Sequence, residues 1–184
     1  KIPSIGRRSA DLDLLILQGE TTRIMPSQVL IDGNIISFQG PVYPTIDLNW
    51  RAQLYKARRL LRTIGGEQLP KQFSANGRLR LSPRLRLDFR VDTKPYVLSG
   101  QSIGSIKAQG FMDNWSVHLK TLKTEINGSP LSGKIRLPLK NPRAPVGRLS
   151  LTDYELPGQS GKATLDLASD SEGKWQGTTL ISKL

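Results

Sequence analysis

The strongest constraint on the fold is a strict two-residue alternation of apolar and charged side chains over residues 78–91. Successive side chains of a β-strand point to opposite faces of a sheet, so this period predicts strands with one apolar and one basic face. The apolar positions are Leu79, Leu81, Leu85, Leu87, Phe89 and Val91. The basic positions are Arg78, Arg80, Arg84, Arg86 and Arg90, and Asp88 shares their face.

The same period recurs along most of the chain, for example at Ile135, Leu137 and Leu139. Asp32-Gly33 and Asn127-Gly128 separate such segments and are typical of tight hairpins, because these residue types tolerate positive φ. About fourteen candidate strands result. We therefore expect an all-β fold, an elongated antiparallel sheet that curls into a groove, an open barrel or a sandwich, since a twisted sheet of this size must curl, split or close.

A glycine repeat accompanies the strands. The segments that begin at Gly133, Gly147 and Gly161 start 14 residues apart, and each continues with a cation and alternating apolar residues. Gly77 begins a further copy, and Gly177 begins a looser one. The repeat predicts stacked meander units in which each glycine opens a strand.

The chain has no initial Met, no signal-peptide pattern and no run of about 18 apolar residues that would span a membrane. Its end, Thr178–Leu184, has the pattern of a strand. We expect residues 1–184 to form a single repetitive β domain that is a piece of a larger protein.

One segment departs from the two-residue period. Trp50, Leu54, Ala57, Leu61 and Ile64 follow helical spacing, and Gly65-Gly66 stands where a helix would end. The spacing predicts one short amphipathic helix over residues 50–64. Such a helix would cover an end of the sheet or, being basic, lie on an anionic membrane.

The charge is strongly positive and unevenly distributed. The chain carries 27 Lys and Arg against 15 Asp and Glu, for a net charge of +12. Residues 51–90 contain eleven of the cations and only two carboxylates, Glu67 and Asp88. Such a field favours phosphates, acidic lipid headgroups or an acidic protein surface, although single arginines on a solvated face need no partner.

Catalysis and metal binding have little support. Without Cys, and with His118 as the only imidazole, the chain offers no thiol nucleophile and no multi-histidine metal site. The segment 128–135 has the glycine and lysine spacing of a phosphate loop, but Ile135 stands where Ser or Thr must bind magnesium. We expect no enzyme activity, no cofactor and no metal, with His118 on the surface of a strand.

Nucleic-acid binding is weakly supported. No helix-turn-helix, zinc-finger or RNA-recognition pattern is present, and aromatic residues make up only 6% of the chain. Trp50, Trp115 and Trp175 are predicted to face the core rather than to form a stacking platform. A basic sheet could still contact phosphates without sequence preference.

Two parts of the chain resemble the repeats of AsmA/TamB-like bacterial envelope proteins. One is the glycine-containing amphipathic segment Leu122–Leu139, and the other is Ile46–Trp50, followed by the predicted helix and by Leu69–Leu81. That resemblance implies a long antiparallel sheet, curled into an aliphatic groove, that carries phospholipids across the periplasm from an inner-membrane anchor. The strand-rich sequence pattern is also similar to that of the periplasmic protein N of type II secretion. On these grounds we expect a periplasmic protein tethered to the inner membrane by a segment outside this chain.

The expected function is a lipid-transfer module. Its groove would be lined by the apolar residues of two predicted strand regions: Leu79, Leu81, Leu85, Leu87, Phe89, Ile135, Leu137 and Leu139. Burial of acyl chains there would stabilise a phospholipid by about 0.8 kcal/mol per CH₂. Two alternatives remain open, a scaffold module that docks an acidic envelope partner and a phosphate-backbone binder. The pattern also fits a closed sandwich whose apolar face packs on itself.

Overall fold

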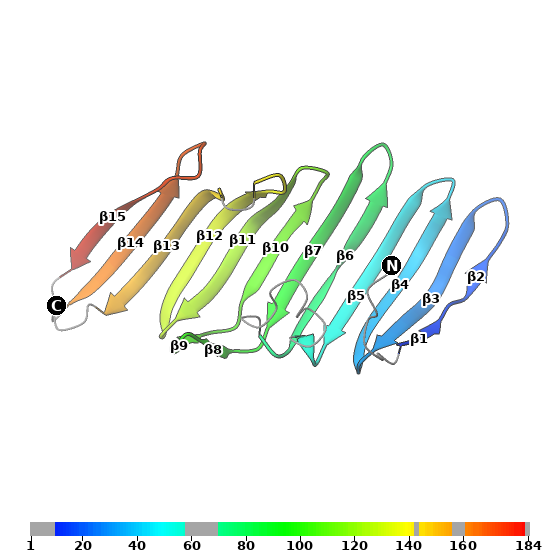
Figure 1. The fold of residues 1–184 in the computed structure, drawn as a ribbon, viewed down its shortest axis with the longest axis horizontal. Helices are drawn as coiled ribbons and strands as arrows, with labels where there is room; N and C mark the ends of the chain where they lie inside the picture. The colour runs from blue at the N-terminus through cyan, green and yellow to red at the C-terminus, as the bar shows by residue number, and fades with distance from the viewer. Residues whose placement is uncertain (1–9, 58–69, 142–143, 156–160, 183–184) are drawn as a thin grey trace, which may run out of the picture.

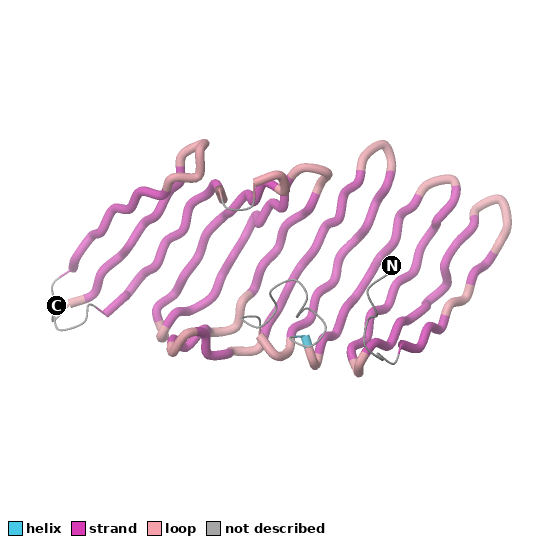
Figure 2. The backbone as a smooth tube through the Cα atoms, in the orientation of Figure 1, coloured by secondary structure: helices cyan, strands magenta, loops and turns pink. Residues whose placement is uncertain are grey.

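The structure is a computed structural model that describes residues 10–57, 70–141, 144–155 and 161–182. In these ranges fifteen strands form one sheet, and Figures 1 and 2 show them as a single layer of long, neighbouring strands. The predicted all-β, antiparallel class is confirmed. The strands are β1 (Ala10–Asp13), β2 (Ile16–Leu17), β3 (Thr22–Ile31), β4 (Asn34–Tyr43), β5 (Ile46–Leu54), β6 (Phe73–Leu81), β7 (Leu85–Thr93), β8 (Tyr96–Leu98), β9 (Gln101–Ile103), β10 (Lys107–Met112), β11 (Ser116–Ile126), β12 (Ser129–Pro138), β13 (Val146–Glu155), β14 (Lys162–Ser169) and β15 (Trp175–Ser182).

The sheet is a meander. Twelve strands follow one another across it in the order β1, β3, β4, β5, β6, β7, β10, β11, β12, β13, β14, β15, and every pair is antiparallel. The short β2 pairs with β3, while the β8–β9 hairpin joins the end of β11. At about 4.8 Å per strand, the twelve-strand path spans about 53 Å. In the described chain β1 and β15 lie at opposite edges and do not pair, so the sheet is not closed into a barrel (Figure 1).

Strand register separates the residues into two faces. Leu79 lies opposite Leu87 in the β6–β7 pair, and Arg80 lies opposite Arg86. We call the face that carries Leu79 and Leu87 the apolar face, and the face that carries Arg80 and Arg86 the polar face. The predicted two-sided strands over residues 78–91 are therefore present.

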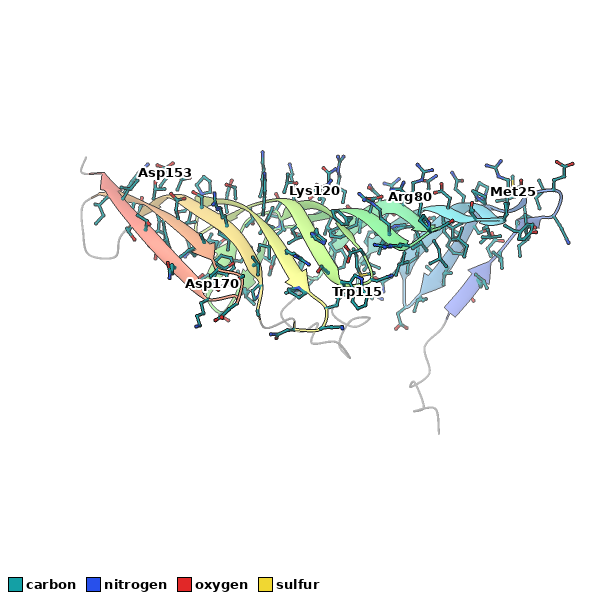
Figure 3. The ribbon with its side chains drawn as sticks, turned by 90° about the horizontal axis from the view of Figure 1, so that it is seen from above. Met25, Arg80, Trp115, Lys120, Asp153 and Asp170 are labelled. Atoms are coloured by element: carbon teal, nitrogen blue, oxygen red, sulfur yellow. The ribbon has the colours of Figure 1, made fainter. Side chains whose placement is uncertain are left out.

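Bulges in β3, β11 and β13 preserve these two faces along long strands. They lie between Ile24 and Ser27, between Leu119 and Leu122, and between Leu151 and Tyr154. In each case two residues oppose one residue of the partner strand, which bends the strand. The extra residue offsets an odd spacing in the sequence, so that apolar residues on both sides of the bulge lie on the same face. Figure 3 shows the bulge residues Met25, Lys120 and Asp153 along the same long side of the sheet as Arg80.

Glycines mark places where strands approach too closely for a side chain. A Cβ on Gly77 would overlap the carbonyl oxygen of Asp88, and one on Gly110 would overlap that of His118. Both Cβ atoms would point to the apolar face, because Gly77 and Gly110 each lie opposite Phe89. The backbones of neighbouring strands therefore approach each other too closely at these points for any residue other than glycine.

The prediction that the repeat glycines open strands is wrong for three of them. Gly77, Gly133 and Gly177 lie inside β6, β12 and β15. A Cβ on Gly133 would overlap the carbonyl oxygen of Arg148, and one on Gly177 would lie 2.8 Å from a methyl carbon of Leu167. Close approach, rather than the start of a strand, explains these glycines.

The predicted helix over residues 50–64 is wrong for residues 50–54, which belong to β5. The spacing from Trp50 to Leu54 satisfies both a helical and a two-residue period. Pairing of Ala52 with Ile36 of β4 and with Ala75 of β6 selects the strand. The part of the prediction over residues 58–64 lies outside the described residues.

The two predicted hairpins are confirmed. Asp32 and Gly33 have φ of 50° and 79°, and Asn127 and Gly128 have φ of 50° and 85°. Positive φ at both central residues is the geometry of a type I′ turn. The first hairpin is also held by the buried Asn34, whose amide nitrogen donates to the carbonyl of Ile31 and whose oxygen accepts from the backbone nitrogen of Lys56.

The single layer encloses little interior. A small cluster of Ala52, Leu54 and Ala57 packs with Ile36, Trp50 and Phe73 near the end of β5. Across the described residues, the bulkiest side chains that are fully buried are those of Asn34 and Ser116, both polar. The accessible surface is 13105 Å², against about 8800 Å² for a compact monomer of this mass. The described strands therefore form one layer and not a closed, self-packed sandwich.

Candidate functional site

The structure brings residues from both predicted lipid-binding regions onto one face. Strand register places an uninterrupted row of apolar side chains across six strands, from β5 to β12. The row consists of Leu48, Leu79, Leu87, Met112, Val117 and Leu137. At about 4.8 Å per strand it extends about 24 Å. Leu79 and Leu87 are thereby connected to Leu137, which lies fifty residues further along the chain.

A second row runs beside the first and contains Phe89 and Ile135. Phe89 lies opposite Gly110, Gly110 opposite Leu119, and Leu119 opposite Ile135. Phe89 thus lies between two glycines, Gly77 of β6 and Gly110 of β10. The described strands β5, β6, β7, β10, β11 and β12 carry no charged residue on this face.

The remaining predicted residues lie at the margins of the apolar face. Leu81 pairs with Leu85 next to the β6–β7 turn, and Leu81 is 50% exposed. Leu139 follows β12, donates from its backbone nitrogen to the carbonyl of Trp115 and is 45% exposed. These residues extend the apolar surface to the ends of the strands.

Four of the five arginines predicted as a basic surface lie on the polar face, Arg84 lies in the turn before β7, and three of the five have carboxylate partners. Arg78 forms a two-pronged ion pair with Asp47 of β5. Arg80 and Arg86 both bind Asp88, at 2.7 Å and 3.0 Å. Within the described chain, this part of the polar face is therefore an ion-pair network rather than a row of unpaired cations.

The network shifts the pKa values of its carboxyl groups. The hydrogen bond from Arg78 holds the pKa of Asp47 below its ordinary value. Burial by itself raises the pKa of Asp88, but the hydrogen bonds and charges of Arg80 and Arg86 together outweigh burial and lower it. Both carboxylates are consequently ionised at neutral pH and offset the arginines.

Arg84 and Arg90 differ from the other three. Arg84 is exposed in the turn before β7, and Arg90 donates to the side-chain oxygen of Gln109 at 3.4 Å. Neither forms an ion pair with a carboxylate of the described residues. They are the members of the predicted basic surface that keep an unneutralised charge.

His118 lies on the polar face, as expected, with neighbours that hold it in place. Its ring stacks on Phe111 with centroids 4.3 Å apart, and its Nε2 atom is 3.3 Å from a carboxylate oxygen of Asp113. Asp113 also accepts hydrogen bonds from the backbone nitrogens of Trp115 and Ser116, and these lower its pKa. The arrangement closes the turn before β11.

The expectation that all three tryptophans face the core is wrong for Trp115. It is 58% exposed in the turn before β11, with the Lys140 ammonium 4.9 Å from its ring centre. Trp50 belongs to the small cluster at the end of β5, and Trp175 is half-buried at the start of β15. Turn residues at the end of a single-layer sheet have no second layer to cover them.

The structure also shows hollows that the sequence did not predict. One of about 800 Å³ lies over β12 to β15 and is lined mainly by polar-face residues, among them Lys134, Arg148, Ser150 and Asp166. Another of about 380 Å³ lies over β3 to β5 and includes Gln28, Ser37, Gln39, Asn49 and Arg51. The predicted lipid-binding residues line neither of these hollows, and most of them are half-buried.

No group of three or more potential metal ligands occurs in the described ranges. Among the same residues, no helix has the length and apolar character needed to cross a membrane. Neither result adds a cofactor to the candidate site.

Comparison of the chain with protein-family models, with curated proteins and with solved structures finds no match. The candidate site therefore rests on its own geometry: a continuous apolar face on one side of a curled sheet, and charged residues on the other.

Proposed function

We propose that the protein binds lipids and that its apolar face holds acyl chains. The observation that carries the proposal is the uncharged row from Leu48 to Leu137, which no other described element covers. Soluble proteins rarely leave an apolar patch of more than a few hundred Å² bare. An acyl chain is a suitable occupant because it is flexible and needs no hydrogen-bond partner.

The dimensions and energy suit transfer better than permanent storage. The row extends about 24 Å. One leaflet makes up half of a bilayer's roughly 30 Å hydrocarbon core, so the row is longer than the hydrocarbon region of one leaflet. A sixteen-carbon chain that is fully buried gains about 12 kcal/mol at about 0.8 kcal/mol per CH₂. An open sheet contacts the chain on one side, so about half of this remains. Lipids held in this way would exchange readily along the face.

The proposal extends to the setting that the family resemblance implies. We propose a non-enzymatic module of the bacterial envelope, located in the periplasm and carrying phospholipids. The support is the long, curled antiparallel sheet with an aliphatic face, together with the repeat texture of Leu122–Leu139.

The alternative scaffold function has weaker support. A docking site for an acidic partner would use the basic surface from Arg78 to Arg90. Three of those five arginines already form ion pairs with Asp47 or Asp88. An acidic partner would have to compete with these intramolecular ion pairs.

Lipid extraction and native mass spectrometry of purified protein test the proposal. We expect co-purifying phospholipid with the wild type and with Asn76→Asp, which places a carboxylate on the exposed polar face of β6. Leu87→Asp puts the same charge in the apolar row and should abolish lipid binding, because an unpaired ion beside acyl chains is strongly disfavoured. Equal lipid content in the two variants would refute the proposal.

A further inference from the structure

The polar face of β12 and β13 carries a compact square of two cations and two hydroxyls. Lys134 lies directly opposite Arg148, and Ser132 lies directly opposite Ser150. Each serine is two residues from the cation of its own strand, so all four side chains point to the same face. Directly paired residues have Cβ atoms about 5 Å apart, so the two cationic stems start as close neighbours.

Such a pair of like charges is unfavourable unless something lies between them. The matching pair in β6 and β7 shows the usual solution, since Arg80 and Arg86 also lie directly opposite each other and share the carboxylate of Asp88. Lys134 and Arg148 form no ion pair with any carboxylate of the described chain. The nearest described carboxylate is that of Asp166, a diagonal neighbour of Arg148 with which it forms no ion pair, so an anion between the two cations would be favoured.

The surroundings of the square leave space for a ligand. Its four side chains line the hollow of about 800 Å³ over β12 to β15. Arg136, two residues from Lys134 on the same face, donates from its Nε atom to the hydroxyl of Ser116 at 3.1 Å and adds to the positive field. One carboxylate enters the same hollow, Asp166, which lies opposite Ser150 on the far side from Ser132.

From this juxtaposition we infer a binding site for a phosphate ester. The phosphate lies between Lys134 and Arg148, and the hydroxyls of Ser132 and Ser150 donate to its oxygens. Asp166 repels a bare phosphate but accepts a hydrogen bond from a hydroxyl or ammonium group of the esterified part. The ligand class is therefore the phosphate ester of a polyol or an amino alcohol rather than inorganic phosphate.

This site is independent of the proposed lipid function, because it lies on the opposite face of the single-layer sheet. A lipid whose acyl chains lie on the apolar face cannot place its phosphate in the square. The phosphate ester is either a free small molecule or the headgroup of a membrane that the polar face contacts.

Calorimetric titration with phosphoethanolamine, glycerol 3-phosphate and inorganic phosphate tests the inference. We expect both esters to bind the wild type at least tenfold more tightly than inorganic phosphate. Lys134→Gln and Arg148→Gln should each weaken ester binding at least tenfold. Arg90→Gln removes the same charge from the polar face of β7 and should change the affinity less than twofold.

Asp166→Asn provides the sharpest discrimination. It should weaken phosphoethanolamine binding and strengthen binding of inorganic phosphate, because the carboxylate attracts the ammonium and repels the bare anion. Loss of the same affinity in Arg90→Gln as in Arg148→Gln would overturn the inference in favour of unspecific charge attraction. So would the absence of ester binding by the wild type at millimolar concentration.

Two further ligands identify the source of the phosphate. Sedimentation with phosphatidylethanolamine and phosphatidylglycerol vesicles that depends on Lys134 and Arg148 assigns it to a membrane headgroup. Binding of the free esters without vesicle binding assigns it to a small molecule. If duplex DNA binds more tightly than the esters, with a steep loss of affinity on adding salt, the site is a nucleic-acid contact and the inference is wrong.

Discussion

Gly110 lies directly opposite Phe89 in the β7–β10 pair, so the residue without a side chain faces the largest apolar side chain of β7. The same glycine has the carbonyl oxygen of His118 where its Cβ would be. One position thus meets two neighbouring strands, the backbone of β11 and the Phe89 position of β7, and has room for no side chain.

Gly110→Ala should destabilise the fold by about 1–3 kcal/mol, because the added methyl group must displace the backbone of β11. Gly19→Ala is the matched control, since no atom lies within 4 Å of its Cβ position and its φ is not positive. Urea unfolding, followed by circular dichroism, measures both. Equal midpoints for the two variants would contradict the close approach at Gly110.

Gly128→Ala should also destabilise the protein, but for a different reason. No atom lies within 4 Å of a Cβ at this position, whereas its φ of 85° is unfavourable for any residue with a side chain. The expected cost is about 1–2 kcal/mol. The same urea titration measures it, and an unchanged midpoint would show that the hairpin does not require the positive φ.

Leu137→Arg should abolish lipid binding while the sheet stays folded. Leu137 is half-buried on an open face, so the arginine can turn toward water instead of entering a packed core. Ser74→Arg, on the exposed polar face of β6, is the control and should retain lipid. Thermal melting and lipid extraction are measured together; collapse of the Leu137→Arg fold would indicate a packed core there and count against the lipid proposal.

Asp88→Asn should destabilise the protein by up to about 1 kcal/mol once solvent screening is included. The substitution leaves Arg80 and Arg86 opposite each other without their shared carboxylate. Asp47→Asn, which affects a single exposed pair, should have a smaller effect. Chemical unfolding at low ionic strength compares them, and the difference should shrink in high salt.

The same carboxylates predict an acid-sensitive contribution to stability. Their pKa values are lower in the folded chain than the ordinary 3.8, so the stabilisation is complete above that value. It is lost as the pH falls through the lowered folded pKa values, where the carboxyl groups take up protons. Wild type should lose more stability than Asp88→Asn between neutral pH and the acid range, and parallel pH profiles would contradict this.

The alternation over residues 78–91 was sufficient to predict both faces of β6 and β7, and the two hairpins followed from Asp32-Gly33 and Asn127-Gly128. Residues 50–54 were mispredicted because Trp50 and Leu54 fit two periods at once, and only pairing with β4 and β6 distinguishes them.

The side-chain contacts between neighbouring strands could not be predicted without knowing the strand register. The row that joins Leu87 to Leu137 passes through Met112 and Val117, which no local pattern connects. The pairing of Arg78 with Asp47, and the square around Lys134 and Arg148, depend in the same way on which residues face each other. A simple antiparallel hairpin predicts which residues of two neighbouring strands face each other. The bulge in β11 changes this register between β11 and β12, so counting residues from the turn gives the wrong partners beyond it.

The meander order has a kinetic consequence. Each principal strand pairs with its nearest long neighbours in sequence, so no pairing has to wait for a distant part of the chain. Such a low contact order favours rapid, stepwise assembly in which each new hairpin adds to an existing edge. Loss of one hairpin would then cause local fraying rather than global unfolding, because each strand depends mainly on its immediate neighbours.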